Sequence, residues 1–276
     1  MQMFKVFTLM TGLTVLLVAA GGYFGGSTGA ILFFGLALVM NVGSYWFSHR
    51  VVLRMYRAEV IERGDAPQLY EMVERLARRA ELPMPTVAIS PQSQPNAFAT
   101  GRNAEHGVVC FTQGILQALS QEELEGVTAH ELAHIKHRHM LVGTIAATMA
   151  GAITMLATIA RWGAIFAGGR NGDRNPIAIL VMSIVAPMAA VIVQMAISRQ
   201  NEFQADASAA EIVGTPQGLA SALRRLDSAA RQVPMEVNPA GAQLAIVNPF
   251  SGRGGVSRLF STHPPMEERI ERLLQR

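Results

Sequence analysis

Charged residues are scarce in this chain. Asp, Glu, Lys and Arg make up 16% of its 276 residues, whereas ordinary soluble proteins contain roughly 25%, and half of the residues are hydrophobic. Four segments contain no charged residue at all: residues 6–24, 29–48, 141–160 and 177–198. Each is about 20 residues long, the length that a helix needs to cross roughly 30 Å of hydrocarbon. We therefore predict a mainly α membrane protein with four transmembrane helices.

Cysteine is nearly absent as well. The single Cys110 excludes an internal disulfide and fits a reducing compartment. The sequence contains no G-x-x-x-x-G-K-[ST] loop, so any ATP-driven unfolding of a substrate has to come from another protein. The positive charges form no stripe with interleaved aromatic residues, and nucleic acid is therefore not an expected partner.

Any one of the four apolar segments could instead be a buried core helix, although such helices are usually shorter and have a polar side, and three of the segments have further interpretations. The first follows Lys5 and could be a signal peptide, but its apolar run exceeds the usual leader and a second apolar segment follows closely. The last two segments contain several Thr residues, Pro187 and Gln194. They could instead form a hairpin that is partly sunk in the bilayer or covered by protein, in which polar groups find partners.

The basic residues predict the orientation. Twenty of the 23 lysines and arginines fall on one side of a four-span topology. The positive-inside rule places this side in the cytoplasm. The expected organisation is two transmembrane helices in residues 1–48, a cytoplasmic catalytic region in 49–140, a transmembrane hairpin in 141–198, and a second cytoplasmic region in 199–276. Small residues at 143, 147 and 151 could pack internally or against another copy, so a homo-oligomer is possible.

The polar regions combine helices with a small β-sheet. Residues 51–61 mix apolar and basic side chains, as in a helix that runs along lipid headgroups. Apolar positions in residues 67–80 follow the period of an amphipathic helix, and residues 86–89, 96–99 and 107–111 have the composition of short strands.

The next helix has a well-specified beginning. Ser120 and Glu123 fit a capping box, with Leu119 and Leu124 in place to form a hydrophobic staple. We expect this helix to run to His139 and to be able to continue into the third apolar segment.

This helix carries the sequence His130-Glu131-Leu132-Ala133-His134. Positions i and i+4 lie on one helix face, so the two histidines can present ring nitrogens to a single metal ion. Glu131 points to the side, where a carboxylate can take a proton from a water at the metal without itself becoming a ligand. The pattern predicts a zinc-dependent hydrolase.

A catalytic zinc ion needs three protein ligands. Glu202 directly follows the fourth apolar segment and, after two crossings, returns to the membrane side of His134. Asp206 lies one turn further along and could accept a hydrogen bond from the non-metal nitrogen of a ligand histidine. His137 and His139 are rival third ligands, although together with their basic neighbours they could simply face the headgroups.

Three motifs occur together in the order found in one family. They are residues 130–134, Asn201-Glu202-x-x-Ala205-Asp206, and Ser261-Thr262-His263-Pro264-Pro265-x-x-x-Arg269. Over essentially its whole length the chain resembles the HtpX-type heat-shock membrane proteases, which are relatives of the CAAX prenyl proteases. The resemblance implies a zincin-like domain at the cytoplasmic face of the bacterial inner membrane. It also implies one Zn²⁺ held by His130, His134 and Glu202, with Glu131 as the base and Asp206 supporting a ligand.

Other roles rest on the resemblance alone. Asn96, Ala97, Phe98 and Ala99 look like the edge strand that pairs with an extended substrate. His263 looks like a helper near the oxyanion, and Arg269 like a residue that ties the C-terminal tail to the zinc helices. The residues themselves also allow a plain helix start at 262–265 and a solvated partnership of Arg269 with Glu268 or Glu271. Residues 233–256 indicate only a mobile loop or lid.

The expected function is therefore that of a membrane-bound zinc metalloendopeptidase that degrades misfolded or damaged membrane proteins during stress. Its expected partners are protein substrates in or near the membrane, the lipid bilayer and, from the resemblance alone, a membrane-bound ATP-dependent protease. One alternative is a processing peptidase for lipidated or signal-type peptides. The other is a non-catalytic adaptor with structural zinc, but structural zinc sites normally use four ligands rich in cysteine, and this chain has one.

Overall fold

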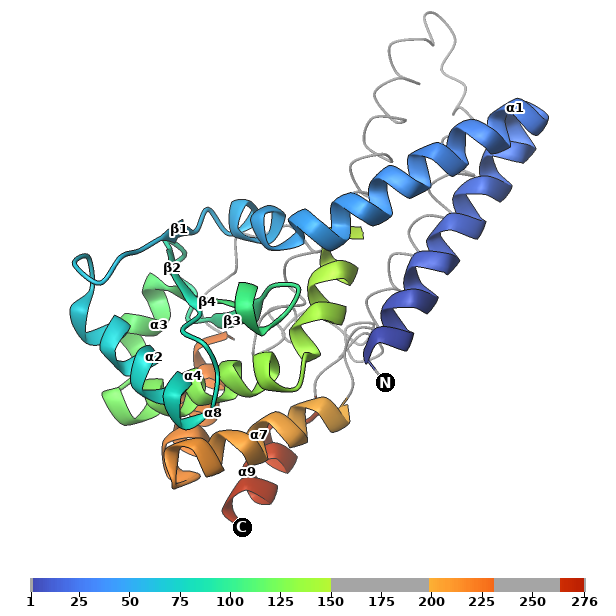
Figure 1. Ribbon diagram of the computed structural model, residues 1–276. Coiled ribbons are helices and arrows are strands. Elements are labelled where there is room, and N and C mark those ends of the chain that lie inside the picture. Colours follow the sequence, from blue (N-terminus) through green and yellow to red (C-terminus); the bar gives the residue numbers. More distant parts are fainter. Residues whose placement is uncertain (1, 150–198, 231–263, 276) are drawn as a thin grey trace, which may run out of the picture.

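A computed structural model describes residues 2–149, 199–230 and 264–275 of the chain (Figure 1). Its first element, α1 (Gln2–Met55), is a hairpin of two helical arms, because the backbone leaves the helical conformation at Gly25 and Gly26. The arms touch near this turn, where a Cβ atom on Gly29 would lie only 2.1 Å from the carbonyl oxygen of Gly21. Glycine is therefore required at this crossing.

Both arms of α1 have the length and composition of membrane spans. The apolar windows cover Gln2–Ala19 and Gly25–Met55. Large apolar side chains point outward from both arms, and Phe4 and Ile31 are more than two-thirds exposed. Two of the four predicted spans are thus present as helices that can cross a bilayer.

The later apolar segments lie mostly outside the described residues. The start of the segment at 141–160 belongs to an apolar helix that the structure describes over His139–Met149. Leu141 and Ile145 of this helix are buried in one cluster with Leu9 and Leu13 of α1. The segment at 177–198 lies entirely outside the described residues, so the four-span count stays a prediction.

A four-stranded sheet forms the centre of the polar region. Its strands are β1 (Glu59–Val60), β2 (Thr86–Ser90), β3 (Ala97–Thr100) and β4 (Val108–Thr112), in the order β1-β2-β4-β3. The pairing of β2 with β4 is parallel, and the other two pairings are antiparallel. β3 lies at an edge of the sheet. It begins at Ala97, one residue later than predicted, so Asn96 lies just before the strand. The predicted headgroup helix at 51–61 is wrong at its end, where β1 forms instead.

Two different layers cover the two faces of this sheet. Alternate residues of β4 belong to different clusters, as the period of a strand requires. Val109 and Phe111 belong to the main core, whereas Val108 and Cys110 belong to a cluster with the last turn of α1. There Tyr56 is fully buried, and its ring lies 4.3 Å from that of Phe98 between centroids. The end of the second membrane arm thus packs directly on the sheet.

Helices form the other layer of the domain (Figure 1). The main core contains side chains from the following elements: α2 (Pro67–Arg79), α3 (Gln113–Ala118), α4 (Gln121–Lys136), α7 (Arg199–Val213), α8 (Gln217–Ala230) and α9 (Met266–Leu274). A short 3-10 helix, η1 (Ala104–His106), lies between β3 and β4. α4 occupies the centre of this layer and approaches α8 very closely at Gly126, where a Cβ atom would lie 2.5 Å from the backbone nitrogen of Leu219.

The predicted start of α4 is confirmed, but its predicted end is wrong. The Ser120 hydroxyl accepts a hydrogen bond from the backbone of Glu123, whose carboxylate accepts one from the backbone of Ser120. The helix ends at Lys136 instead of reaching His139, because Arg138 has a φ of 57°. This left-handed conformation interrupts the helix, so α4 does not continue into the third apolar segment.

Candidate metal centre

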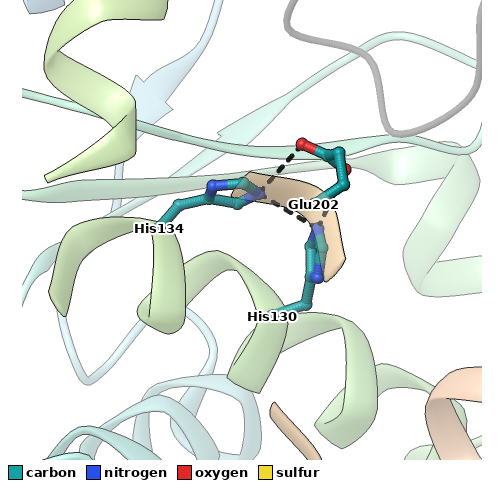
Figure 2. Close-up of side chains that lie close together, drawn as sticks. All are labelled: His130, His134 and Glu202. Carbon is teal, nitrogen blue, oxygen red and sulfur yellow. Dashed lines mark hydrogen bonds and ion pairs between the residues drawn. The ribbon is translucent and has the colours of Figure 1, made fainter. Parts of the chain in front are cut away.

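Three predicted ligands meet in the structure (Figure 2). The Nε2 atoms of His130 and His134 lie 3.1 Å apart, and the Glu202 carboxylate lies 3.7 Å and 3.6 Å from them. A tetrahedral ion with bonds of about 2.1 Å would place its ligand atoms about 3.4 Å apart. In the part of the chain that the structure describes, no other group of His, Cys, Asp and Glu side chains has this arrangement. The donor set and its spacing therefore fit a zinc ion.

Two helices supply these ligands. His130 and His134 lie one turn apart on α4, and Glu202 lies in the first turn of α7, which packs along α4. Asp206, one turn beyond Glu202, places Oδ1 3.0 Å from Nδ1 of His130. This spacing suits a hydrogen bond that leaves Nε2 of His130 available as a ligand atom.

Arg269 connects α9 to the same group of residues. Its side chain is fully buried, and it donates two hydrogen bonds of 2.7 Å and 2.9 Å to the carboxylate of Asp206. A third nitrogen, Nη1, lies 3.3 Å from Oε2 of Glu202. Because Arg269 is buried, it is not the solvated side chain that the sequence alone also allowed. Glu268 pairs with Arg272 instead.

Burial and neighbouring charges set the protonation of these groups. Burial lowers the pKa of His134 to about 3, so this imidazole is neutral and can offer a lone pair. Burial opposes ionisation of Asp206, but the charge and hydrogen bonds of Arg269 outweigh it and lower the pKa of this carboxyl. Burial also opposes protonation of His130, yet the adjacent Asp206 carboxylate prevails and raises the pKa of that ring.

Glu131 is buried beside the three ligands without belonging to their group. Burial raises its pKa to about 7, against the effect of the nearby His130. The Glu202 carboxylate raises it further, whereas a backbone hydrogen bond from Ala99 in β3 lowers it. A bound cation would lower this pKa. A carboxyl group whose pKa lies near neutrality can both take and return a proton.

Comparison with known proteins identifies the family. Residues 64–276 match the family model described as "Peptidase family M48". The chain belongs to peptidase family M48.

Relatives that cover nearly the whole M48 chain carry the name "Protease HtpX homolog". The chain is 58% identical to the homolog of Gemmatimonas aurantiaca over 99% of its own length and 98% of the relative's. It is 54% identical to that of Salinibacter ruber, over 99% and 97% of the two chains. A solved structure titled "Crystal Structure of S. mikatae Ste24p" aligns with 98% of this chain and 64% of that one, at 20% identity and a TM-score of 0.48. The predicted HtpX-type membership is confirmed, and the protein is a membrane metalloprotease of the zinc-dependent M48 family.

The rival ligands of this M48 chain lie outside the three-donor group. His137 contacts α7, where its Nε2 lies 2.8 Å from the Ser208 hydroxyl. His139 is buried, and its Nδ1 lies 3.3 Å from Nδ1 of His134. In His134 it is the other ring nitrogen, Nε2, that faces Glu202. His263 and the segment at 233–256 lie outside the described residues.

Sequence reasoning missed two contacts of the M48 site. One is the backbone hydrogen bond from Ala99 to Glu131, which brings the edge strand next to the expected base. The other is the contact of His139 with His134. The first depends on how β3 packs against α4, for which the sequence carries no signal. The second could have been considered only if the end of α4 had been predicted correctly.

Proposed function

We propose that His130, His134 and Glu202 hold one zinc ion per chain, and that this protease cleaves misfolded or damaged membrane proteins at the cytoplasmic face of the bacterial inner membrane. The observation that carries the proposal is the buried His-His-Glu group, whose donor atoms have tetrahedral spacing, with Glu131 beside it. The three ligands leave a position free for a reactant, as in catalytic and not in structural zinc sites. Neither the adaptor nor the specific processing peptidase is favoured.

Each residue of the site has a defined task in this proposal. When bound, zinc supplies Lewis acidity that activates water and polarises the scissile carbonyl. Glu131 takes a proton from the attacking water and returns it to the leaving amine. Asp206 orients His130, and Arg269 holds Asp206 in its ionised form. His263 is proposed to assist near the oxyanion.

The edge position of β3 supports a role in substrate binding. One side of this strand pairs with β4, and the other side is the edge of the sheet. Ala97, Phe98 and Ala99 have buried side chains, so a substrate pairing here would be held through backbone hydrogen bonds. Ala99 lies next to Glu131, and a peptide aligned on Asn96–Ala99 would therefore pass the base.

Zinc analysis tests the ligand set. Purified wild-type protein in detergent should contain one zinc ion per chain, and Glu202→Ala should bind zinc at least about 100-fold more weakly, because a direct ligand matters more than its supporting partners. Glu211→Ala is the matched control, since Glu211 is an exposed carboxylate on the same helix. Wild-type zinc affinity in Glu202→Ala would contradict the assignment of this ligand.

Surface labelling tests the proposed orientation. A cysteine introduced by Glu105→Cys lies at an exposed position of η1, whereas the native Cys110 is fully buried. A membrane-impermeant maleimide should label this variant in inverted inner-membrane vesicles and not in intact spheroplasts, and wild-type protein should stay unlabelled in both. Labelling in spheroplasts would place the catalytic domain on the outer side.

A further inference from the structure

Each metal-ligating histidine needs an acceptor for its second ring nitrogen, and the structure provides different acceptors for the two rings. Nδ1 of His130 faces the Asp206 carboxylate at 3.0 Å. Nδ1 of His134 faces Nδ1 of His139 at 3.3 Å. We propose that His139 is a positioning residue, which accepts a hydrogen bond from Nδ1–H of His134 and so fixes the tautomer and orientation of this zinc ligand. The inference rests on the proposed zinc site.

The tautomer follows from which atom faces the metal position. Nε2 of His134 faces both His130 and Glu202. A neutral imidazole that offers the lone pair of Nε2 carries its proton on Nδ1, and this N–H then needs an acceptor. The contact at Nδ1 is another imidazole, which can accept only through a nitrogen that carries no proton. His139 must therefore be the tautomer that is protonated at Nε2.

The surroundings of His139 support this tautomer. Gln204 of α7 lies against the stacked rings of His137 and His139: its amide Nε2 is 3.3 Å from Nδ1 of His137, and its side chain also interacts with His139. Because Nδ1 of His139 faces His134, the nitrogen that remains for Gln204 is Nε2, and the Gln204 amide oxygen can accept its proton. A chain of hydrogen bonds then runs from His134 through His139 to Gln204, two residues beyond the ligand Glu202.

The break at the end of α4 makes this contact possible. If α4 had continued without interruption, His139 would follow His134 by five positions and point about 140° away around the helix axis. The left-handed backbone of Arg138 turns the chain so that the ring of His139 folds back onto His134. His137 anchors the turn to α7, with Nε2 2.8 Å from the Ser208 hydroxyl, and its ring stacks on that of His139.

The test compares two replacements of His139. His139→Leu removes the acceptor, whereas the amide oxygen of His139→Asn comes close to the position of Nδ1 and can still accept. Zinc affinity is measured by chelator competition in detergent, and ligand geometry by the visible absorption of the Co²⁺-substituted protein. His139→Leu should weaken zinc binding by about 10- to 100-fold and shift the cobalt bands. His139→Asn should keep most of the affinity and the wild-type bands.

Controls separate this inference from a general effect on folding. Thermal unfolding in EDTA should be similar for wild type and both variants, and His106→Leu, which replaces an exposed histidine of η1, should leave zinc affinity unchanged. If His139→Leu does not fold, His139→Gln serves instead. Its amide lies one methylene farther from the backbone, so it should lose affinity where His139→Asn does not.

The outcomes distinguish the inference from the proposed function. If wild-type protein binds no zinc, the proposed function fails. If wild-type protein binds zinc and His139→Leu matches it in affinity and cobalt spectrum, the positioning role is overturned. Equal but partial losses in His139→Leu and His139→Asn would also overturn it, because the ring would then act through packing and not as an acceptor. A complete loss of zinc in both variants would make His139 a ligand.

Discussion

Glu131→Gln should lower the rate of peptide hydrolysis by a factor of about 10²–10⁴, the usual contribution of a positioned acid or base, while zinc affinity stays close to that of the wild type. The Glu131 side chain is buried next to the three proposed ligands, but it is not one of the groups that could hold the metal ion. Glutamine has nearly the same shape and keeps an acceptor for the backbone of Ala99, yet it cannot take a proton from water. The loss should therefore appear in the chemical step.

The measurement is the cleavage of an unfolded protein by the purified enzyme in detergent, together with zinc content. Glu122→Gln is the matched control, because Glu122 is exposed in the first turn of the same helix. Its activity should equal that of the wild type. Undiminished cleavage by Glu131→Gln would remove Glu131 from the mechanism, and a loss of zinc would show that Glu131 is instead a ligand.

Features that depend on short separations along the chain were predictable. The capping box joins positions three residues apart, and the two histidines of α4 are one helical turn apart, so both follow from helix geometry alone. Glu202 lies far from His134 in sequence. It was predicted because it directly follows an apolar segment and shares a membrane side with His134. The structure brings these residues together.

Other features that depend on tertiary contacts could not be predicted from the residues alone. No Gly or Pro marks the break at Arg138, and the turn is held by contacts of His137 with α7, about 70 residues later. The residues alone likewise offered Arg269 two nearby carboxylates, and the expectation that it ties the C-terminal tail to the zinc helices came from the family resemblance. Its partner Asp206 lies 63 residues away on another helix. The packing of α9 against α7 brings Arg269 to Asp206, and spacing along the chain does not predict this packing.

The buried position of Arg269 leads to the prediction with the largest effect on stability. Arg269→Met should lower the free energy of unfolding by about 3–5 kcal/mol in the metal-free protein, the usual effect of removing one partner of a buried ion pair. The substitution keeps an unbranched apolar side chain of similar length. It leaves Asp206 and Glu202 buried near each other without the cation that contacts both of them.

Denaturant titration in detergent, with EDTA present, measures this loss. Arg272→Met is the control from the same helix, because Arg272 is largely exposed and pairs at the surface with Glu268. Its cost should be about 1 kcal/mol or less. Equal effects of the two substitutions would show that the buried contacts of Arg269 contribute no more than a surface ion pair.

A second substitution identifies the origin of the lost stability. If the cost of Arg269→Met comes from the negative charge left on Asp206, then Asp206→Asn in the same protein should recover part of it, and the two single losses should exceed the loss of the double variant. Zinc should also reduce the deficit of Arg269→Met, because a cation bound by Glu202 replaces part of the missing positive charge. The alternative is that Arg269 stabilises the protein by packing alone. In that case the losses of the two single variants would add up to the loss of the double variant, and the loss in Arg269→Met would be the same with and without zinc. Arg269 would then have no electrostatic link to the metal centre.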